Sequence, residues 1–595
     1  MNQPLFQRKN AENHPPVLKR LLHYLLPYKR TLAVCFVLIL AVTALELSKP
    51  VLIGRAIDQC ILSAQGGAPA ERFARLCTMS LLYICVLVAL FLCERYQHLF
   101  MQETGQKIIY DLRNDLFAHT EGLSMRFFDT TPVGKIVTRI TNDAESINEV
   151  FSEILINLIR NLVKVLGLAF IMLFLNVRMA LWSFVALPAA VFLTALFRIL
   201  SRRAFRITRT KLTALNTFLS EHLSGMKVIQ LFGQEDNNYA DFRDKSGELY
   251  RASFRELLIN AIFRPSIYFV SVIALFIVTL SGAREVLSGV LSIGTMYVFL
   301  QYIVSFFSPI EELAEQFSAL QSAIASAEKI FTLFDEQPAI VEPEHPILLE
   351  QVQGRIEFDH VWFAYENEDW VLRDVSFTIE PGQKVAFVGA TGAGKSSILN
   401  LIGRYYDVQK GSVRVDGIDV RDLSLSQLRS LVGQVQQDVF LFSGDISRNI
   451  RLLDTDISDE NMVTAATDVN ASRFIDHLPR KYQEEVGERG STLSAGQRQL
   501  LSFARTLAHK PTILILDEAT SNIDTETEQW IQEALVRLMQ GRTSIMVAHR
   551  LSTIQHADMI MVMHHGKIRE RGTHQELLAM NGIYKKLYLI QLSEH

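Results

Sequence analysis

The sequence predicts two folds in one chain: a domain of six membrane-spanning α-helices with long polar helical extensions, followed by an α/β domain. Apolar residues concentrate before about residue 310, in runs long enough to cross a lipid bilayer. Beyond residue 354, short β-type runs alternate with helical ones, which is typical of a sheet covered by helices. At 595 residues the chain also exceeds the size of a single core. We therefore predict a membrane domain at 1–323, a linker at 324–354 and an α/β domain at 355–595.

The composition narrows the class of protein. Hydrophobic residues make up 49% of the chain, which is high for a soluble protein, and a net charge of −4 does not indicate a nucleic-acid partner. The five cysteines, Cys35, Cys60, Cys77, Cys85 and Cys93, form no CxxC pair, so we interpret them as buried apolar residues rather than zinc ligands or disulfides. The first sixteen residues are polar and show no cleavable signal peptide, so the first span is expected to direct the chain to the membrane.

Six apolar runs are candidates for membrane spans, since a helix needs about 20 apolar residues to cross ~30 Å of hydrocarbon. They lie at 32–53, 76–92, 155–175, 180–200, 262–280 and 293–307, and residues 16–28 before them predict an amphipathic helix at the membrane surface. An even number of spans leaves both chain ends on one side. The positive-inside rule makes that side the cytoplasm because most basic residues near the spans lie there. These are Lys19, Arg20, Lys29, Arg30, Arg202, Arg203 and Arg206.

The spacing between the spans predicts long helical arms. The loops at 58–74, 176–179 and 281–292 are short, whereas the segments between spans two and three and between spans four and five are long, polar and helical in period. An arm of ~30 residues would extend ~45 Å at 1.5 Å per residue, far into the cytoplasm. The arms turn at breaker-rich points, at 127–134 and near Ser224 and Gly225. Each turn is either a simple hairpin tip or a contact helix that pushes on another domain.

Ionisable residues occur in two of the spans, Glu46 and Lys49 in the first and Arg160 and Lys164 in the third. An ionisable group inside a membrane is a functional candidate by default. Here Glu46 either lines a substrate path or pairs with Lys49 three residues away. Arg160 and Lys164 are expected to reach the cytoplasmic interface.

The second half of the chain begins after an acidic segment that contains prolines. Its β-type runs lie at 355–358, 371–379, 385–388, 412–415, 513–516 and 544–547. The third of these runs leads into Gly389-Ala390-Thr391-Gly392-Ala393-Gly394-Lys395-Ser396-Ser397 and then a helical stretch. Glycines let the backbone N–H groups approach an anion at the helix start, Lys395 suits the β/γ-phosphates and the Ser396 hydroxyl suits Mg²⁺. This pattern predicts a P-loop NTPase, although a tight turn without a ligand would show the same glycines.

A second set of residues indicates the reaction. The apolar run 513–516 ends in Asp517 and Glu518, where Asp517 can hold Mg²⁺ through water and Glu518 can polarise the attacking water. The two acids could also only cap a helix. His549 follows the run 544–547 and could bond the γ-phosphate, or it could be structural.

The run Leu493-Ser494-Ala495-Gly496-Gln497 resembles the LSGGQ signature of the ATP-binding cassette (ABC) family, between the phosphate loop and the strand-end acids as in that family. With six spans ahead of one cassette, residues 17–592 resemble an ABC exporter half-transporter. The runs LKRLL, GTHQELL and IYKKLYLIQL at the chain ends resemble the MdlB-type subunits of bacterial multidrug transporters. That similarity favours a heterodimer slightly, and a homodimer remains open.

The resemblance assigns a role to each matching residue. Tyr365 stacks on adenine, and Gln437 touches Mg²⁺ and reports to the membrane domain. Ser494 and Gly496 contact the γ-phosphate of ATP held by the partner subunit, and Gln497 is a further nucleotide-binding residue of the signature. The family's loop across the dimer interface matches 521–524, its switch histidine matches His549, its exporter loop matches 486–490, and its coupling helices match the two tips.

Three positions depart from the family pattern. Ala495 replaces a glycine, Asn522 stands where alanine is common, and Gln436 where proline is frequent. Ala495 keeps its backbone N–H, so a modest weakening of phosphate contact is expected. No catalytic group is lost.

The resemblance therefore implies ATP-driven export of hydrophobic or amphipathic substrates, of the multidrug or lipid type, by alternating access. It implies ATP and Mg²⁺ as ligands, a second half-transporter as partner, and a bacterial inner membrane with the termini and cassette in the cytoplasm. An exporter-fold importer, an ATP-gated channel or regulatory subunit, and a soluble ABC ATPase are the alternatives, the last opposed by the spans.

Overall fold

The computed structural model describes residues 17–62, 69–517, 525–547, 554–555 and 557–593. The chain divides into two compact units. The helical unit contains the chain up to Gly122 and Pro132–Glu336, and the α/β unit contains Leu123–Thr131 and the chain from Gln337 onward. The short segment Leu123–Thr131 therefore packs with the α/β unit, although it lies between two spans in the sequence.

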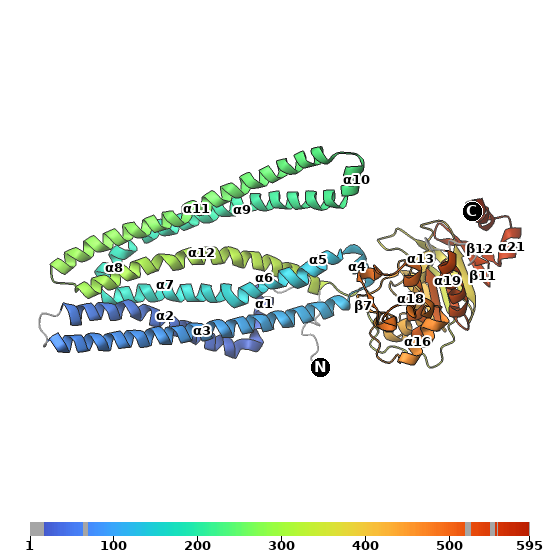
Figure 1. Cartoon of the computed structure of the whole chain (residues 1–595), viewed down its shortest axis with the longest axis horizontal. Coiled ribbons are helices and arrows are strands. Elements are labelled where there is room, and N and C mark those ends of the chain that lie inside the picture. The colour runs from blue at the N-terminus through green and yellow to red at the C-terminus, as the bar shows by residue number, and fades with distance from the viewer. Residues whose placement is uncertain (1–16, 63–68, 518–524, 548–553, 556, 594–595) are drawn as a thin grey trace. The chain divides into compact units, whose positions relative to one another are not determined.

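The helical unit consists of long helices with short connections (Figure 1). Six of its segments are long and apolar enough to cross a membrane, which confirms the predicted number. Its elements are α1 (Val17–Leu25), η1 (Leu26–Tyr28), α2 (Lys29–Ala56), η2 (Ile57–Ile61), α3 (Pro69–Glu121), α5 (Val133–Thr138), η3 (Arg139–Asp143), α6 (Ala144–Glu149), η4 (Val150–Ile154), α7 (Leu155–Leu175), α8 (Val177–Phe184), α9 (Leu187–Ser224), α10 (Met226–Leu231), α11 (Glu235–Leu287) and α12 (Ile293–Asp335).

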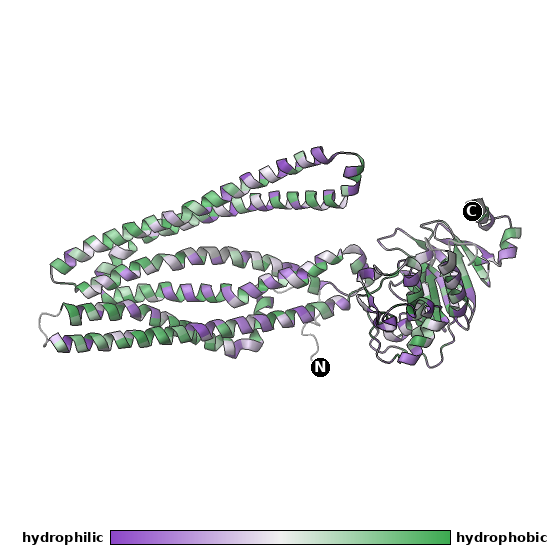
Figure 2. Ribbon diagram, viewed as in Figure 1, coloured by the Kyte–Doolittle hydropathy of each residue, from purple (hydrophilic) through white to green (hydrophobic). Residues whose placement is uncertain are grey.

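The predicted arms are continuous with the spans. α3 and α11 each contain 53 residues, so each forms a membrane span and its polar arm as one continuous helix. The first arm pair turns at α4 (Met125–Thr130) and α5, and the second at Gly225 and α10, as the breaker residues predicted. In Figure 2 the hydrophobic residues of α9 and α11 lie toward α8 and the hydrophilic ones toward α10. α12 continues to Asp335, so the first part of the predicted linker is helical.

The predicted amphipathic helix corresponds to α1 and packs against the end of α12. Arg20 is buried, donates to Asp335 at 2.9 Å and lies 4.3 Å from the centre of the Phe331 ring. An ion pair and a cation–π contact at a buried site hold this helix more firmly than apolar contact alone. The end of α12 is therefore tied to α1.

Polar contacts join three of the spans to one another. Lys164 of α7 lies 2.9 Å from the Glu46 carboxylate of α2, and Asn161 of α7 donates to Glu312 of α12 at 2.9 Å. The expected pair of Glu46 with Lys49 was wrong, because the partner of Glu46 comes from another helix. We expected Lys164 to reach the cytoplasmic interface. Because it pairs with Glu46 inside the helix bundle, its charge does not need to do so.

The cysteines follow the prediction only in part. All five are free, and Cys35 and Cys60 are buried as expected. Cys77 and Cys85 are exposed, which contradicts the interpretation of all five as buried. Both belong to α3, whose most apolar 18-residue window has none of its residues buried inside the chain. These cysteines thus lie on a surface suited to lipid or to another chain.

The first residues of α12 are capped by a residue of the first span. The backbone N–H of Gly294 and the hydroxyl of Ser292 donate to the two Asp58 oxygens at 2.7 and 2.6 Å. The approach is close, because a Cβ at Gly294 would lie 2.0 Å from the carbonyl oxygen of Gly54. A carboxylate near a helix N-terminus is favourable because of the helix dipole.

The α/β unit contains a four-stranded sheet in the order β2-β1-β4-β5, a six-stranded sheet in the order β12-β11-β3-β10-β9-β6, and the pair β7-β8. In the six-stranded sheet only β12 is antiparallel to its neighbour. All six predicted strands are present. The strands are β1 (Ile356–Phe363), β2 (Leu372–Ile379), β3 (Lys384–Val388), β4 (Lys410–Val415), β5 (Ile418–Asp419), β6 (Val432–Val435), β7 (Gly444–Asp445), β8 (Glu485–Val486), β9 (Ile513–Asp517), β10 (Thr543–Val547), β11 (Met559–His564) and β12 (Lys567–Gly572).

Helices cover this sheet, and the continuous apolar runs reflect burial of both faces. Val385 and Phe387 of β3 belong to one hydrophobic core, whereas Ala386 and Val388 belong to the other. The helices are α4, α13 (Lys395–Ile402), α14 (Leu425–Leu431), α15 (Ile446–Arg451), α16 (Asp459–Asp468), α17 (Ser472–Ile475), η5 (Lys481–Gln483), η6 (Glu488–Gly490), α18 (Ala495–Ala508), α19 (Thr525–Leu538), α21 (His574–Ala579) and α22 (Ile583–Ser593).

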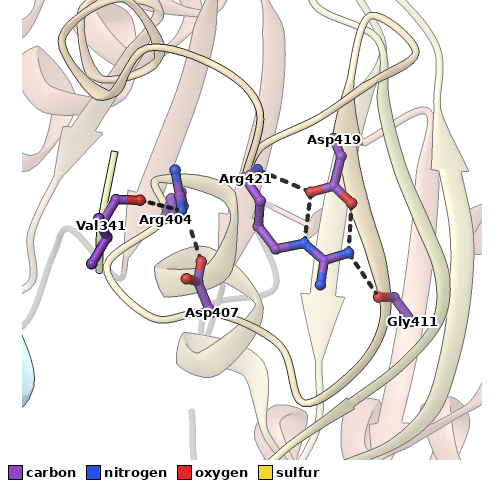
Figure 3. A network of polar contacts seen from close by, with 6 residues as sticks. All are labelled: Val341, Arg404, Asp407, Gly411, Asp419 and Arg421. Carbon is purple, nitrogen blue, oxygen red and sulfur yellow. Dashed lines mark hydrogen bonds and ion pairs between the residues drawn. The ribbon is translucent and has the colours of Figure 1, made fainter. Parts of the chain in front are cut away.

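Two arginines fix the segments around α13 (Figure 3). Arg404 follows α13, is 3% exposed, and donates to Asp407 at 3.0 Å and to the Val341 carbonyl at 3.1 Å. Arg421 donates to both Asp419 oxygens. Burial would raise the pKa of Asp419, but the hydrogen bonds and charge of Arg421 outweigh it and lower that pKa. The segment around Val341, which leads into the α/β unit, is thus bound to the end of α13.

We predict that Gly294→Ala destabilises the helical unit. The added methyl group would meet the Gly54 backbone, and overpacking of this kind costs about 1–3 kcal/mol. Thermal unfolding of the purified protein in detergent measures the loss. Gly134→Ala is the matched control, since its Cβ would meet no atom within 4 Å, and an equal loss in both variants would contradict the prediction.

Candidate functional site

The glycine-rich loop joins β3 to α13 in a conformation that requires glycine. Gly392 and Gly394 have φ values of 79° and 100°, in the region that other residues rarely adopt. A Cβ at Gly389 would lie 2.3 Å from the Met563 carbonyl oxygen, and one at Gly394 would lie 2.7 Å from the Leu372 side chain. The loop is therefore pressed against neighbouring strands on one side, while Gly392 is exposed on the other.

The first residues of α13 form a candidate anion site. The residue before the helix, Gly394, has no side chain to cap it, so the first N–H groups of α13 receive no side-chain cap. The Ser396 side chain is exposed beside these groups, as Thr391 is in the loop. Uncapped N–H groups and the positive end of the helix dipole attract a phosphate.

Lys395 supplies the charge. Its side chain is 5% exposed, and its ammonium donates to the carbonyl oxygens of Gly389 and Ala390 at 2.6 and 3.0 Å. The lysine therefore lies folded over the loop. Its ammonium is thereby held beside the glycine-rich loop that the sequence predicts to bind phosphate.

The sheet register brings further predicted residues to the same edge. β6, β9, β10 and β3 are parallel, and Val547 lies beside both Phe387 and Asp517. Asp517 thus ends β9 near the level at which β3 enters the loop. Gln437 follows β6, whose Val435 pairs with Leu516, and its side chain is exposed. The predicted Glu518 and His549, with the segment 521–524, lie outside the described residues.

Tyr365, the candidate adenine contact, is tied to the helix after the loop. Its hydroxyl lies 3.1 Å from the Ser397 hydroxyl, and Asn400 donates to it at 3.5 Å. Its ring meets those of Phe363 and Tyr406 edge-on, with centroids 4.8 and 5.1 Å away. At 37% exposure, the ring is accessible to a planar ligand.

The signature residues begin α18. The Ser494 hydroxyl accepts from the Gln497 N–H at 3.2 Å, and the Gln497 side chain accepts from the Ser494 N–H at 3.0 Å, which makes a capping box. Gly496 is buried in the first turn, and the departure Ala495 is half-buried. Ser494 is exposed and its O–H proton is not used by the cap, so it can still donate to a ligand. Gln497 is held in place by the cap.

α18 also holds the loop that begins at Gln437, by means of residues that the sequence did not reveal. Arg505 donates to the Asn449 and Phe440 carbonyls at 2.8 and 3.1 Å, and Asn449 exchanges hydrogen bonds with the Phe442 backbone. Burial lowers the pKa of Arg505. The helix that starts at the signature is thereby fixed to the predicted Gln437 loop.

A second residue that we missed, Tyr406, connects the aromatic cluster to the first arm tip. Its hydroxyl donates to the Asp129 carboxylate of α4, within the α/β unit. Burial, the hydrogen bond to Asp129 and the charge of that carboxylate raise the pKa of Tyr406, so the hydroxyl remains the donor at neutral pH. Asp129 was part of the predicted tip, but nothing in the sequence indicates a partner 277 residues away.

Comparison with known proteins covers both units. The ABC transporter transmembrane region matches residues 32–310, and the ABC transporter domain matches residues 372–521. The ABC transporter ATP-binding protein YknV of Bacillus subtilis is 42% identical over 577 residues, which are 96% of this chain and 94% of YknV.

Two further similarities concern exporters. An ATP-dependent lipid A-core flippase of Syntrophus aciditrophicus is 35% identical over 589 residues, 99% of this chain and 96% of the flippase. The structure of a bacterial Atm1-family ABC exporter with ATP bound is similar with a TM-score of 0.80 and 26% identity, covering 94% of this chain and 99% of that one.

We predict that Lys395→Ala weakens nucleotide binding by about ten- to a hundredfold, since a hydrogen bond to a charged group contributes about 1.5–3 kcal/mol. Titration with a fluorescent ATP analogue measures the dissociation constant. Lys384→Ala, at the start of β3, is the control for general loss of positive charge. Equal affinity of wild type and Lys395→Ala would show that Lys395 does not contribute to nucleotide binding.

Proposed function

Because this chain belongs to the ABC transporter family and couples ATP hydrolysis to transport, we propose that it forms one half of a dimeric exporter of hydrophobic or amphipathic molecules. The observation that carries the proposal is the fusion of six candidate spans to one α/β unit that contains both a phosphate loop and a signature helix. A half-transporter architecture implies dimerisation with another half-transporter. Each ATP would lie between the phosphate loop of one chain and the signature of the other.

The proposed roles follow the chemistry of each group. Lys395 and the N–H groups of α13 bind the β/γ-phosphates, and Tyr365 contacts adenine. Glu518 polarises the attacking water and His549 bonds the γ-phosphate. Ser494 and Gly496 of the second chain complete the phosphate contacts.

Mg²⁺ fits the donors at this edge of the sheet. The Ser396 hydroxyl, the Asp517 carboxylate and the Gln437 amide are oxygen donors, the ligands that Mg²⁺ prefers, and one carboxylate is typical where phosphates supply other ligands. When bound, the ion would neutralise charge on the phosphates.

The energy of nucleotide binding must reach the spans through the arm tips. A chain of contacts supports this role for α4: Asp129 binds Tyr406, whose ring touches that of Tyr365, which in turn bonds Ser397 of α13. ATP that binds the closed dimer better than the open one would then change the population of membrane conformations. This coupling is what alternating access requires.

The membrane portion favours amphipathic cargo. Glu46 and Lys164 neutralise each other and are only about a quarter exposed, so fixed net charge in the spans is small. The relatives include a lipid A-core flippase and YgaD of Bacillus subtilis, whose name proposes multidrug export. We infer a multi-pass protein with both termini and the α/β unit in the cytoplasm, as the basic residues beside the spans indicate.

We expect Glu518→Gln to bind ATP normally and to lose ATP hydrolysis almost completely. The amide keeps the size of the side chain but does not act as a base, so the chemical step fails while binding remains. Phosphate release by the reconstituted protein, alone or with a second half-transporter, measures turnover. Normal turnover in this variant would reject Glu518 as the base, and absence of turnover in all wild-type preparations would reject the proposed function.

Tyr406→Phe is expected to reduce ATP-driven transport several-fold while ATP affinity stays unchanged. The change removes one hydrogen bond, about 1 kcal/mol, and leaves Asp129 without its donor. Tyr405→Phe is the neighbouring control. Asp129→Asn should be milder, because its amide oxygen still accepts from the Tyr406 hydroxyl. A transport rate equal to wild type in Tyr406→Phe would exclude this contact from coupling.

A further inference from the structure

A cavity of about 510 Å³ lies between α9 and α11. It is lined by one face of each helix, with Leu200, Ala204 and Lys211 on α9 and Ala252 and Ile259 on α11 among its residues. The two helices run antiparallel, so Leu200 and Ile259 lie toward one end of the cavity and Lys211 toward the other. Ala204 and Ala252 are each 8% exposed, and their small side chains leave room between the helices.

The cavity carries a concentration of positive charge. Arg203, Arg251 and Arg255 line it and are exposed, and within the part of the chain that the structure describes none of the three forms an ion pair. The one acid among the lining residues, Glu248, is 2.8 Å from Lys211; the hydrogen bond from Lys211 and, more weakly, the charge of Arg251 lower the pKa of Glu248. Four cations, three of them guanidinium groups, thus share one cavity with a single carboxylate.

The polarity changes along the cavity. Leu200 ends the apolar run of the fourth span, and Ile259 lies just before that of the fifth, so this end faces the hydrocarbon boundary. The arginines come next, and the Lys211–Glu248 pair closes the far end. An apolar mouth followed by a cationic chamber matches a molecule with an apolar tail and an anionic head.

A second cavity shows that this arrangement is more than a general excess of basic residues near the membrane. The cavity of about 310 Å³ between α2 and α3 is lined by Arg30 and Lys107. There Lys107 pairs with Glu103 at 2.6 Å, which leaves a single unpaired cation in its lining. Of these two cavities, the one between α9 and α11 offers several guanidinium groups to one ligand, and the other does not.

We infer that the α9–α11 cavity binds the phosphate head group of an anionic lipid, with the acyl chains directed past Leu200 and Ile259 into the bilayer. Guanidinium groups bind phosphate oxygens through paired hydrogen bonds, and basic pockets between spans on the cytoplasmic side suit anionic head groups. The site would bind this lipid whether or not the lipid is also the transported molecule, so the inference is independent of the proposed cargo.

The test titrates the detergent-purified full chain with dioleoyl phosphatidic acid and follows bound lipid by native mass spectrometry. The variant Arg203→Gln/Arg251→Gln/Arg255→Gln empties the cavity of its unpaired charge. The matched control, Arg202→Gln/Arg209→Gln/Arg243→Gln, removes the same charge from exposed positions of the same two helices outside the cavity. An unchanged thermal unfolding midpoint of the helical unit in detergent verifies that both variants are folded.

We expect the cavity variant to bind the lipid about a hundredfold more weakly and the control to change little, since each cation contributes roughly a factor of five. Equal losses in both variants would show general surface attraction and overturn the site. Unchanged binding in the cavity variant would overturn it as well.

Two further measurements identify the source of the anion. Ala252→Leu fills the cavity without changing charge, and we expect it to weaken lipid binding at least tenfold, because Ala252 lies on the cavity wall. Inorganic phosphate should compete only at concentrations far above those of the lipid. Phosphate that competes as well as phosphatidic acid, or dioleoyl phosphatidylcholine that binds equally well, would overturn the assignment to an anionic lipid.

Discussion

The uncapped first turn of α13 is the constraint on which the rest of the α/β unit depends. N–H groups without internal acceptors need a partner at the point where β3 ends, and the loop glycines and Lys395 are arranged around that need. The parallel strands bring Asp517 and Gln437 to the same edge, so the residues for phosphate chemistry follow from sheet direction. Arg404 and Arg505 then hold the neighbouring segments in register with it.

The two compact units are not two consecutive stretches of the sequence. Leu123–Thr131 belongs to the α/β unit although it connects two long helices of the other unit. Its Asp129 reaches the aromatic cluster beside the phosphate loop through Tyr406. The chain joins this segment at both of its ends to helices of the helical unit, α3 before it and α5 after it.

The sequence predicted what depends on local pattern. The six spans, the arm turns and the strands around the phosphate loop follow from periodicity, from breakers and from glycine spacing, and each is confirmed. Contacts between distant residues were not predictable: Glu46 binds Lys164 rather than Lys49, and Tyr406 finds Asp129. Such pairs depend on how helices rotate and pack. The roles of Glu518 and His549 remain predictions from the sequence.

The Asp58 contact with the start of α12 gives the membrane portion a preferred resting arrangement. The carboxylate accepts from both the Gly294 N–H and the Ser292 hydroxyl, so it joins the end of the first span to the start of the sixth. If the first and sixth spans separated at this end, both hydrogen bonds would be lost, each of which contributes roughly 1 kcal/mol. In the orientation proposed above, this one aspartate would hold the non-cytoplasmic ends of the first and sixth spans together.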